Sequence, residues 1–237
     1  MFFAATTRLP AEGAACDSDC DGMCEAGIGP GSQHLYRRAQ LINRCTAKRV
    51  MDVLLAVFAL VFLFPALIVI CIAIKLDSPG PILFRQERYG ANRRVFLLYK
   101  FRSMNVMETH GAFTQALRAD SRITRVGAIL RRTSIDELPQ LFNVMRGEMS
   151  LVGPRPHAVA MDQAFAQILP QYTDRHFVRP GLTGLAQVAG HRGPTEGTDQ
   201  IKARLRYDRA YIRKWSVMLD LRLIAETPLK LLGPNAF

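Results

Sequence analysis

The stretch VLLAVFALVFLFPALIVICIAI, Val53 to Ile74, is an unbroken run of uncharged residues with one proline, Pro65, near its middle. As an α-helix its 22 residues would extend about 33 Å, close to the thickness of the hydrocarbon core of a bilayer. The stretch therefore predicts a membrane-associated helix. It begins too late in the chain and is too long to be a cleaved signal peptide.

Two features of this stretch bear on its topology. Pro65 removes a backbone hydrogen bond and predicts a kink at mid-depth, from which the segment could return to its own side. Basic residues flank both ends of the stretch: Arg44, Lys48, Arg49, Lys75, Arg85 and Arg88. Basic flanks favour the cytoplasmic face, which suits a re-entrant segment. Spanning helices nevertheless tolerate proline, and the residues alone favour a plain span while leaving both topologies open.

The charge balance restricts the partners of the protein. The 237 residues carry a formal net charge of +11 and a pI near 9.9, which calls for nucleic acid, anionic lipid or a phosphorylated substrate. The membrane stretch favours lipid and phosphate, and no nucleic-acid recognition motif accompanies the charge. The five cysteines form no disulfide framework, which indicates reduced thiols in a cytoplasmic setting.

Composition divides the chain into three parts. Residues 1–35 are small, acidic and glycine-rich and predict a disordered N-terminal tail. Residues 36–76 contain the membrane-associated segment with its basic approach. Residues 77–237 are numerous enough to form one domain with its own core.

The tail contains two motif-like features, and neither is complete. Cys16, Cys20 and Cys24 lack a fourth ligand at zinc spacing. The acidic run that starts at Asp17 resembles the beginning of a calcium loop, but Ile28 stands where the loop needs a glutamate. We therefore predict no metal site in the tail.

Beyond the apolar stretch the sequence predicts an α+β domain that is mainly helical. Alternating apolar residues on both sides of a turn at 90–92 predict a short β-hairpin with strands 82–88 and 94–102. Apolar residues at helical spacing predict surface amphipathic helices around it. The other predicted elements are a helix with an arginine face over 122–132, a strand over 149–152, and helices over 157–168, 201–215 and 218–232. The glycines of 179–187 predict either close backbone approach to a ligand or tight turns.

The segment TSIDELPQL, 133–141, has two interpretations. Ser134 and Glu137 fit a capping box, and Asp136 could cap a helix with Pro139 in its first turn. Alternatively, Asp136 and Glu137 could supply a nucleophile and a metal ligand at a helix N-terminus that binds phosphate. The residues alone favour the caps.

Six blocks of sequence together resemble one family. They are Lys48 to Asp52 with the apolar stretch, Lys100 to Met104, Leu130 to Leu141, Gly147 to Pro156, Arg179 to Val188, and Tyr207 to Asp220. In this order they resemble the bacterial sugar transferases, or monotopic phosphoglycosyl transferases, which transfer a sugar phosphate to polyprenyl phosphate. The resemblance covers the chain from about Lys48 to its end.

The resemblance implies a mechanism and a topology. It implies that the apolar stretch is re-entrant and broken at Pro65, and that a cytoplasmic catalytic domain lies on the inner membrane of a bacterium. It implies that Asp136 attacks the β-phosphate of a UDP-sugar, expels UMP and passes the sugar phosphate to undecaprenyl phosphate, and that Glu137 binds Mg²⁺. Further candidates for substrate binding are Lys100, Arg102, Arg131, Arg155, Arg179 and Asp208.

The resemblance leaves other points open. Residues 191–196 are similar to members that transfer glucose or galactose phosphate to initiate exopolysaccharide assembly, and the chain resembles the minimal catalytic form of the family. Whether the protein forms a homodimer is open. The alternative function is a non-catalytic, membrane-anchored scaffold of a polysaccharide assembly system, in which the two carboxylates are helix caps.

Overall fold

The structure is a computed structural model that describes residues 31–105, 120–193 and 197–231. The chain divides into two units, Met1–Gln33 and His34–Phe237, and the architecture below belongs to the second. The predicted tail, with Cys16, Cys20 and Cys24, lies outside the described residues except for its last five positions. Of these, Gln33 to Leu35 already belong to helix α2.

Two consecutive helices form the N-terminal part of the second unit. Helix α2, Gln33–Arg44, buries Leu35 and Ile42 against the domain core. Helix α3, Thr46–Asp77, contains the apolar stretch, and its most apolar window has a mean hydropathy of 3.2 with 6% of it buried. It is therefore long and apolar enough to cross a membrane, which is consistent with membrane association.

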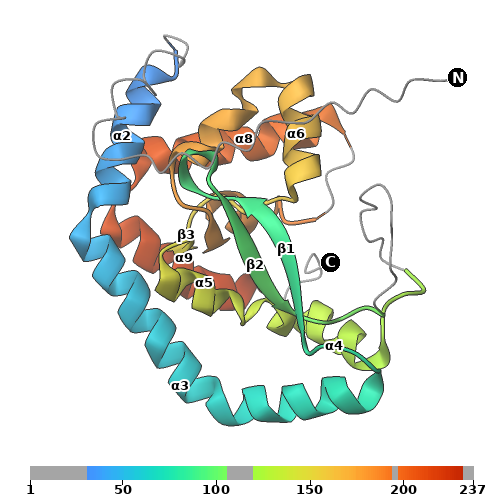
Figure 1. Ribbon diagram of the computed structural model, residues 1–237. Coiled ribbons are helices and arrows are strands. Elements are labelled where there is room, and N and C mark those ends of the chain that lie inside the picture. The colour runs from blue at the N-terminus through green and yellow to red at the C-terminus, as the bar shows by residue number, and fades with distance from the viewer. Residues whose placement is uncertain (1–30, 106–119, 194–196, 232–237) are drawn as a thin grey trace, which may run out of the picture. The chain divides into compact units, whose positions relative to one another are not determined.

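Helix α3 is continuous but bent. Figure 1 shows that its ribbon changes direction between its two halves, and Pro65 lies inside the helix. An interior proline lacks the N–H that would close the preceding turn and is the usual cause of such a bend.

The first turns of α3 are fixed to the domain by buried polar contacts. Lys48 Nζ lies 2.6 Å from Asp220 Oδ2, on helix α9, Val217–Leu231. Asp52 accepts hydrogen bonds from Ser150 Oγ at 2.7 Å and from Leu151 N at 3.1 Å. Pairing and hydrogen bonding of this kind offset the cost of burying the two charges.

The last turn of α3 is fixed to the same unit by other elements. Asp77 accepts a hydrogen bond from Val126 N, in helix α4, Arg125–Thr133. Arg102 donates to the carbonyl oxygens of Ile74 and Ser78. Both ends of the 32-residue helix therefore contact one folded unit.

The predicted hairpin is present. Strand β1, Leu83–Tyr89, pairs antiparallel with β2, Val95–Phe101, around a turn that contains Gly90 and the short helix η1, Ala91–Arg93. In this register Phe84 lies opposite Lys100, and Arg85 lies opposite Tyr99. Because side chains alternate along a strand, these two pairs are on opposite faces of the hairpin.

Most of the remaining elements are helical, as predicted. They are η2 Ile135–Glu137, α5 Gln140–Arg146, α6 Val159–Ile168, η3 Pro170–Phe177, α7 Leu185–Val188 and α8 Thr198–Lys214. Helix α9 contains Pro228, as expected for the last helix. The sequence did not predict η3, nor the second sheet, in which β3, Ser150–Val152, pairs in parallel with β4, Gly181–Thr183.

The glycines of 179–187 serve the packing of this second sheet. A Cβ atom on Gly181 would lie 2.0 Å from Gly153 N, and one on Gly184 would lie 2.2 Å from Gly153 O. No side chain fits at such distances. The close approach that the glycines permit is thus between two backbone segments of the domain itself.

Candidate active site

Asp136 and Glu137 lie on the 3₁₀ turn η2, between α4 and α5. Helix α4 ends because Ser134 adopts a left-handed conformation with φ 57°. Helix α5 begins at Gln140 after Pro139, and no side chain caps η2 or α5. The capping interpretation of this segment is therefore wrong, and both carboxylates are available for another role.

Glu137 is buried and held by two cations. Its Oε1 atom lies 2.8 Å from Lys100 Nζ and 2.5 Å from Arg155 Nη2, and its Oε2 atom lies 3.0 Å from Arg155 Nη1. Burial would raise the pKa of Glu137, but Arg155 and Lys100 outweigh it and hold the pKa well below the ordinary value. Glu137 is therefore ionised and fixed in orientation.

Asp136 is buried to a similar extent but is engaged differently. Within the described part of the chain its carboxylate makes no hydrogen bond. Burial raises its pKa to about 6, Lys100 opposes the rise, and the charge of Glu137 adds to it. An ionised carboxylate that is desolvated and free of donors is a good nucleophile.

Two further arginines act on this pair. Arg131, which was predicted, lowers the pKa of Asp136, and its Nη1 lies 3.4 Å from Met104 Sδ. Arg192, which was not predicted as a site residue, lies 3.0 Å from Ser134 Oγ and 3.9 Å from Glu137 Oε2. The sequence signal for it was present, because Arg192 lies in the glycine-rich segment after α7. Four cations thus surround two carboxylates, which suits an anionic ligand.

The structure does not bring Arg102 and Arg179 to the two carboxylates. Arg102 donates to backbone carbonyls at the end of α3, including that of Pro79 at 2.8 Å. Arg179 donates to Gly147 O at 3.0 Å and Asn43 O at 3.1 Å. Their guanidinium groups serve backbone segments that would otherwise leave carbonyl groups unpaired.

Asp208 lies in a buried network behind Arg155. It accepts from Arg175 Nε at 3.0 Å, and Arg175 also donates to Arg155 O at 2.6 Å. Burial raises the pKa of Asp208, and Arg175 and Arg204 oppose the rise. The carboxylate therefore orients Arg175, which supports the backbone that carries Arg155.

His157 connects this network to the segment of Arg192. Its Nε2 accepts from Arg204 Nη1 at 2.8 Å, and Arg204 also donates to Gly193 O at 2.8 Å. Burial and the charges of Arg175 and Arg204 hold the pKa of His157 well below its usual value, so the ring is neutral. Its Nδ1 lies 2.5 Å from Tyr172 OH and 2.7 Å from Arg175 Nη1, so each ring nitrogen faces an arginine.

The donor set for a metal ion is small. Among the described residues no group of three or more His, Cys, Asp or Glu side chains could hold a metal. Asp136 and Glu137 are adjacent carboxylates, and Mg²⁺ commonly binds one or two carboxylates together with water and substrate phosphates. The residues fit Mg²⁺ only if the substrate completes its coordination.

A turn with two buried carboxylates ringed by basic residues, in a unit that also contains a long apolar helix, is consistent with a membrane-associated protein that binds anionic ligands. Residues 43–234 match the model of the bacterial sugar transferase family, and the chain belongs to that family.

Curated relatives agree with this assignment. A UDP-glucose:undecaprenyl-phosphate glucose-1-phosphate transferase of Xanthomonas campestris is 49% identical over 79% of this chain and 39% of its own length. A protein of the same name from Caulobacter vibrioides is 49% identical over 80% of this chain and 72% of its length. The exopolysaccharide production protein PSS of Rhizobium leguminosarum is 46% identical over 76% of this chain and 92% of its own length. The chain spans about two fifths of the length of the first of these relatives.

Proposed function

We propose that the protein transfers a sugar 1-phosphate from a UDP-sugar to undecaprenyl phosphate, with release of UMP, and thereby initiates assembly of an exopolysaccharide or related glycan. The observation that carries this proposal is the asymmetry of the two adjacent carboxylates. Glu137 is fixed by Lys100 and Arg155, whereas Asp136 accepts no hydrogen bond from the residues that the structure describes. The names of the relatives supply the substrates.

The first step follows from this asymmetry. An Asp136 carboxylate oxygen attacks the β-phosphorus of the UDP-sugar, and the bond from that phosphorus to the α–β bridging oxygen breaks. The electron pair leaves with UMP, and an acyl phosphate holds the sugar phosphate. Lys100, Arg131, Arg155 and Arg192 offset the repulsion between the anionic carboxylate and the diphosphate.

The second step uses the lipid substrate. A phosphate oxygen of undecaprenyl phosphate attacks the phosphorus of the acyl phosphate, and Asp136 leaves as a carboxylate. The product is the undecaprenyl diphosphate sugar. Two displacements at one carboxylate predict ping-pong kinetics.

The membrane attachment fits this reaction. Both ends of α3 contact one unit, at Lys48 and Asp52 on one side and at Asp77 on the other. This supports a re-entrant helix bent at Pro65, with the domain on the cytoplasmic face of the inner membrane, where the headgroup of the acceptor is accessible. Cysteine labelling tests the topology: a cysteine introduced before α2 should resist a reagent added from the periplasm, and labelling there would contradict re-entry.

We also propose Mg²⁺ as the metal, held by Glu137 and the phosphates of the donor. When bound, it would neutralise charge on the diphosphate. The predictions that Arg102, Arg179 and Asp208 bind substrate find no support in their contacts, which are with backbone carbonyls and Arg175.

The sugar is proposed to be glucose. Several relatives at 47 to 49% identity are named for UDP-glucose, whereas a relative from Aeromonas hydrophila, at 44%, is named for N-acetylgalactosamine. A panel of UDP-sugars scored for UMP release would test this assignment.

The decisive assay omits the lipid. Purified protein with UDP-glucose and Mg²⁺ should release UMP in a burst equal to the amount of enzyme, and Asp136→Asn should release none. The alternative, a non-catalytic scaffold, predicts no burst with any UDP-sugar. If the protein completes the overall transfer but gives no burst, the covalent intermediate is rejected and the transferase function is retained.

A further inference from the structure

Phe84 is an exposed aromatic residue beside the candidate active site. It lies directly opposite Lys100 in the hairpin, and Lys100 Nζ is 2.8 Å from Glu137. Residues opposite each other on one face have Cβ atoms about 5 Å apart. Phe84 is nevertheless 45% exposed, so the domain leaves much of its ring uncovered next to a buried charge cluster.

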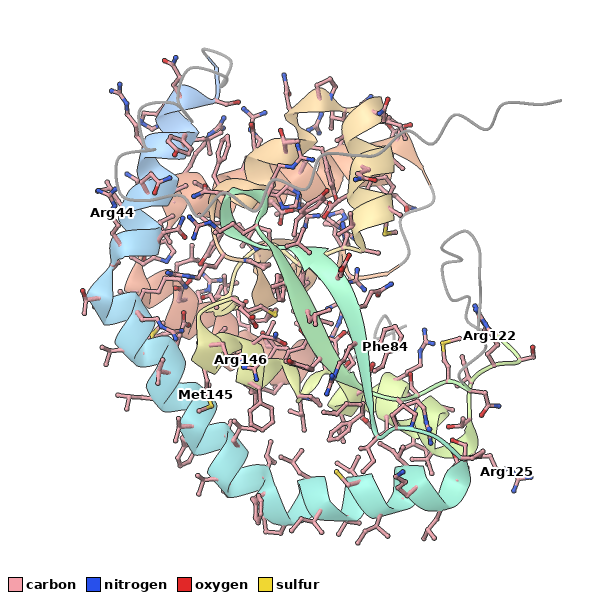
Figure 2. The ribbon with its side chains drawn as sticks, viewed as in Figure 1. Arg44, Phe84, Arg122, Arg125, Met145 and Arg146 are labelled. Atoms are coloured by element: carbon pink, nitrogen blue, oxygen red, sulfur yellow. The ribbon has the colours of Figure 1, made fainter. Side chains whose placement is uncertain are left out.

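The two faces of the hairpin differ. On the other face Arg146 contacts Tyr99, with its Nη1 2.7 Å from the hydroxyl and its guanidinium 5.2 Å from the ring centre. Figure 2 shows Arg146 and Phe84 on opposite sides of the hairpin. The face that carries Lys100 also carries Phe96 and Leu98, which are buried, so Phe84 is the apolar residue of this face that stays exposed.

Along that face β1 changes from apolar to basic. Phe84, Gln86 and Arg88 alternate with residues of the other face, so they share the Lys100 side. Arg88 Nη2 lies 2.5 Å from Gln86 Oε1, while its buried Nε has no hydrogen-bond partner among the described residues. Burial and the charge of Arg155 lower the pKa of Arg88 to about 10. This end of the face suits the anionic groups of a ligand.

The apolar end of the face is the end nearest the membrane-associated helix. Ile82 and Leu83, which precede Phe84, belong to the apolar cluster that contains Ile74 of α3. The basic end lies near α6, since Arg88 forms a bridge with Ala158. An apolar group that arrives from the bilayer thus meets Phe84 first.

We propose that Phe84 binds the first isoprene units of the polyprenyl acceptor and so aligns its phosphate with Asp136. This inference rests on the proposed function and deepens it. A nucleotide base could also stack on a phenyl ring. The diphosphate of the nucleotide, however, suits the basic end of the face, away from Phe84. An isoprenoid chain is apolar, enters from the α3 side and has its phosphate at one end, as the face requires.

The experiment compares the two half-reactions of Phe84→Ala in lipid vesicles. The UMP burst from UDP-glucose without acceptor should match the wild type. The KM for undecaprenyl phosphate should rise about tenfold, because an apolar contact is lost. Phe84→Leu should restore most of the affinity, since the contact requires an apolar surface and not a ring.

Leu97→Ala is the matched control. Leu97 is also 45% exposed, but it lies on the face of Tyr99. The Leu97→Ala variant should have the same KM for undecaprenyl phosphate as the wild type. Vesicle co-sedimentation of Phe84→Ala should equal that of the wild type, and a short-chain prenyl phosphate in solution should lose affinity to the same degree as undecaprenyl phosphate.

Each other outcome would overturn the inference in a recognisable way. A raised KM for UDP-glucose that Leu does not restore would assign Phe84 to the base. Loss of vesicle binding with normal affinity for the short acceptor would assign it to membrane anchoring. Unchanged kinetics would remove any role in binding. Absence of both the burst and the overall transfer in the wild type would refute the proposed function, whereas the outcomes above concern Phe84 alone.

Discussion

Two clusters in this molecule both place a buried carboxylate beside a lysine, but they differ in how the carboxylates are satisfied. The first, here called the helix-foot cluster, comprises Lys48, Tyr211, Trp215 and Asp220 at the first turns of α3. Asp220 accepts from Lys48 at 2.6 Å, from Tyr211 at 2.9 Å and from Trp215 at 2.9 Å. Lys48 is also 3.3 Å from Val152 O. Both charges in this cluster have partners within the protein.

The active-site cluster is unequal. Glu137 pairs with two of the cations, and Arg131 and Arg192 add further positive charge. Asp136 accepts no hydrogen bond from any residue in the described ranges. In the helix-foot cluster the contacts use the polar atoms fully, which indicates a structural role. In the active-site cluster four cations act on two buried carboxylates, one of which, Asp136, has a raised pKa, and this indicates function. The presence of a buried carboxylate alone does not distinguish the two.

The largest effect on stability is expected at the helix foot. Lys48→Met leaves Asp220 buried without its cation, and we expect the free energy of unfolding to fall by about 3–5 kcal/mol. Chemical denaturation in detergent would measure it. The UMP burst per folded molecule should stay at the wild-type value. A loss of the burst with unchanged stability would show that this cluster belongs to the active site.

The next effect concerns Arg155. Arg155→Met removes the two hydrogen bonds to Glu137 and a cation beside Asp136, and kcat/KM for UDP-glucose should fall about a hundredfold. Arg179→Met is the control, because its contacts are with Gly147 and Asn43 carbonyls. It should lower stability while kcat/KM of the folded enzyme is retained. Equal kinetic losses in both variants would contradict the division between the two sets of arginines.

A smaller effect is expected from Asp136 itself, as a gain in stability. Its pKa rises on folding from 3.8 to about 6, so ionisation destabilises the folded state as pH rises through this window. The free energy of unfolding of Asp136→Asn should therefore be about 1–3 kcal/mol larger than that of the wild type at pH 8. The difference should vanish below pH 4. A destabilised variant at pH 8 would support a structural carboxylate, as in the helix-foot cluster.

The smallest effect is expected at an exposed ion pair. Arg222 and Glu226 lie four residues apart on α9, with Arg222 72% exposed. Arg222→Ala should change the free energy of unfolding by less than about 0.5 kcal/mol, because water screens the pair. A loss comparable to that of Lys48→Met would mean that charge count, and not burial, governs stability here.

Much of the fold could be predicted because local pattern determines it. The apolar stretch, the hairpin and the helices over 201–215 and 218–232 follow from periodicity and turn residues, and α8 and α9 confirm the last two. The parallel pairing of β3 with β4 joins Ser150 to Gly181, and no short-range signal specifies such a distant partner.

Part of the candidate site could also be predicted, because some of its residues lie in recognisable local blocks of sequence. Asp136, Glu137 and Arg155 lie in blocks that resemble the family, and the structure brings them together. The capping box failed because the left-handed Ser134 ends α4 before a helix can start at that residue. Arg102 and Arg179 could not be separated from Arg155 by sequence, because the three differ only in which acceptor lies within reach.

The central claim is that Asp136 becomes covalently attached to the sugar phosphate. Intact-protein mass spectrometry after mixing the enzyme with UDP-glucose and Mg²⁺, without lipid, would test it directly. We expect one added hexose phosphate, located to the peptide that contains Asp136, absent from Asp136→Asn and removed by undecaprenyl phosphate. An unmodified protein that nonetheless completes transfer when lipid is added, or an adduct on another residue, would contradict it.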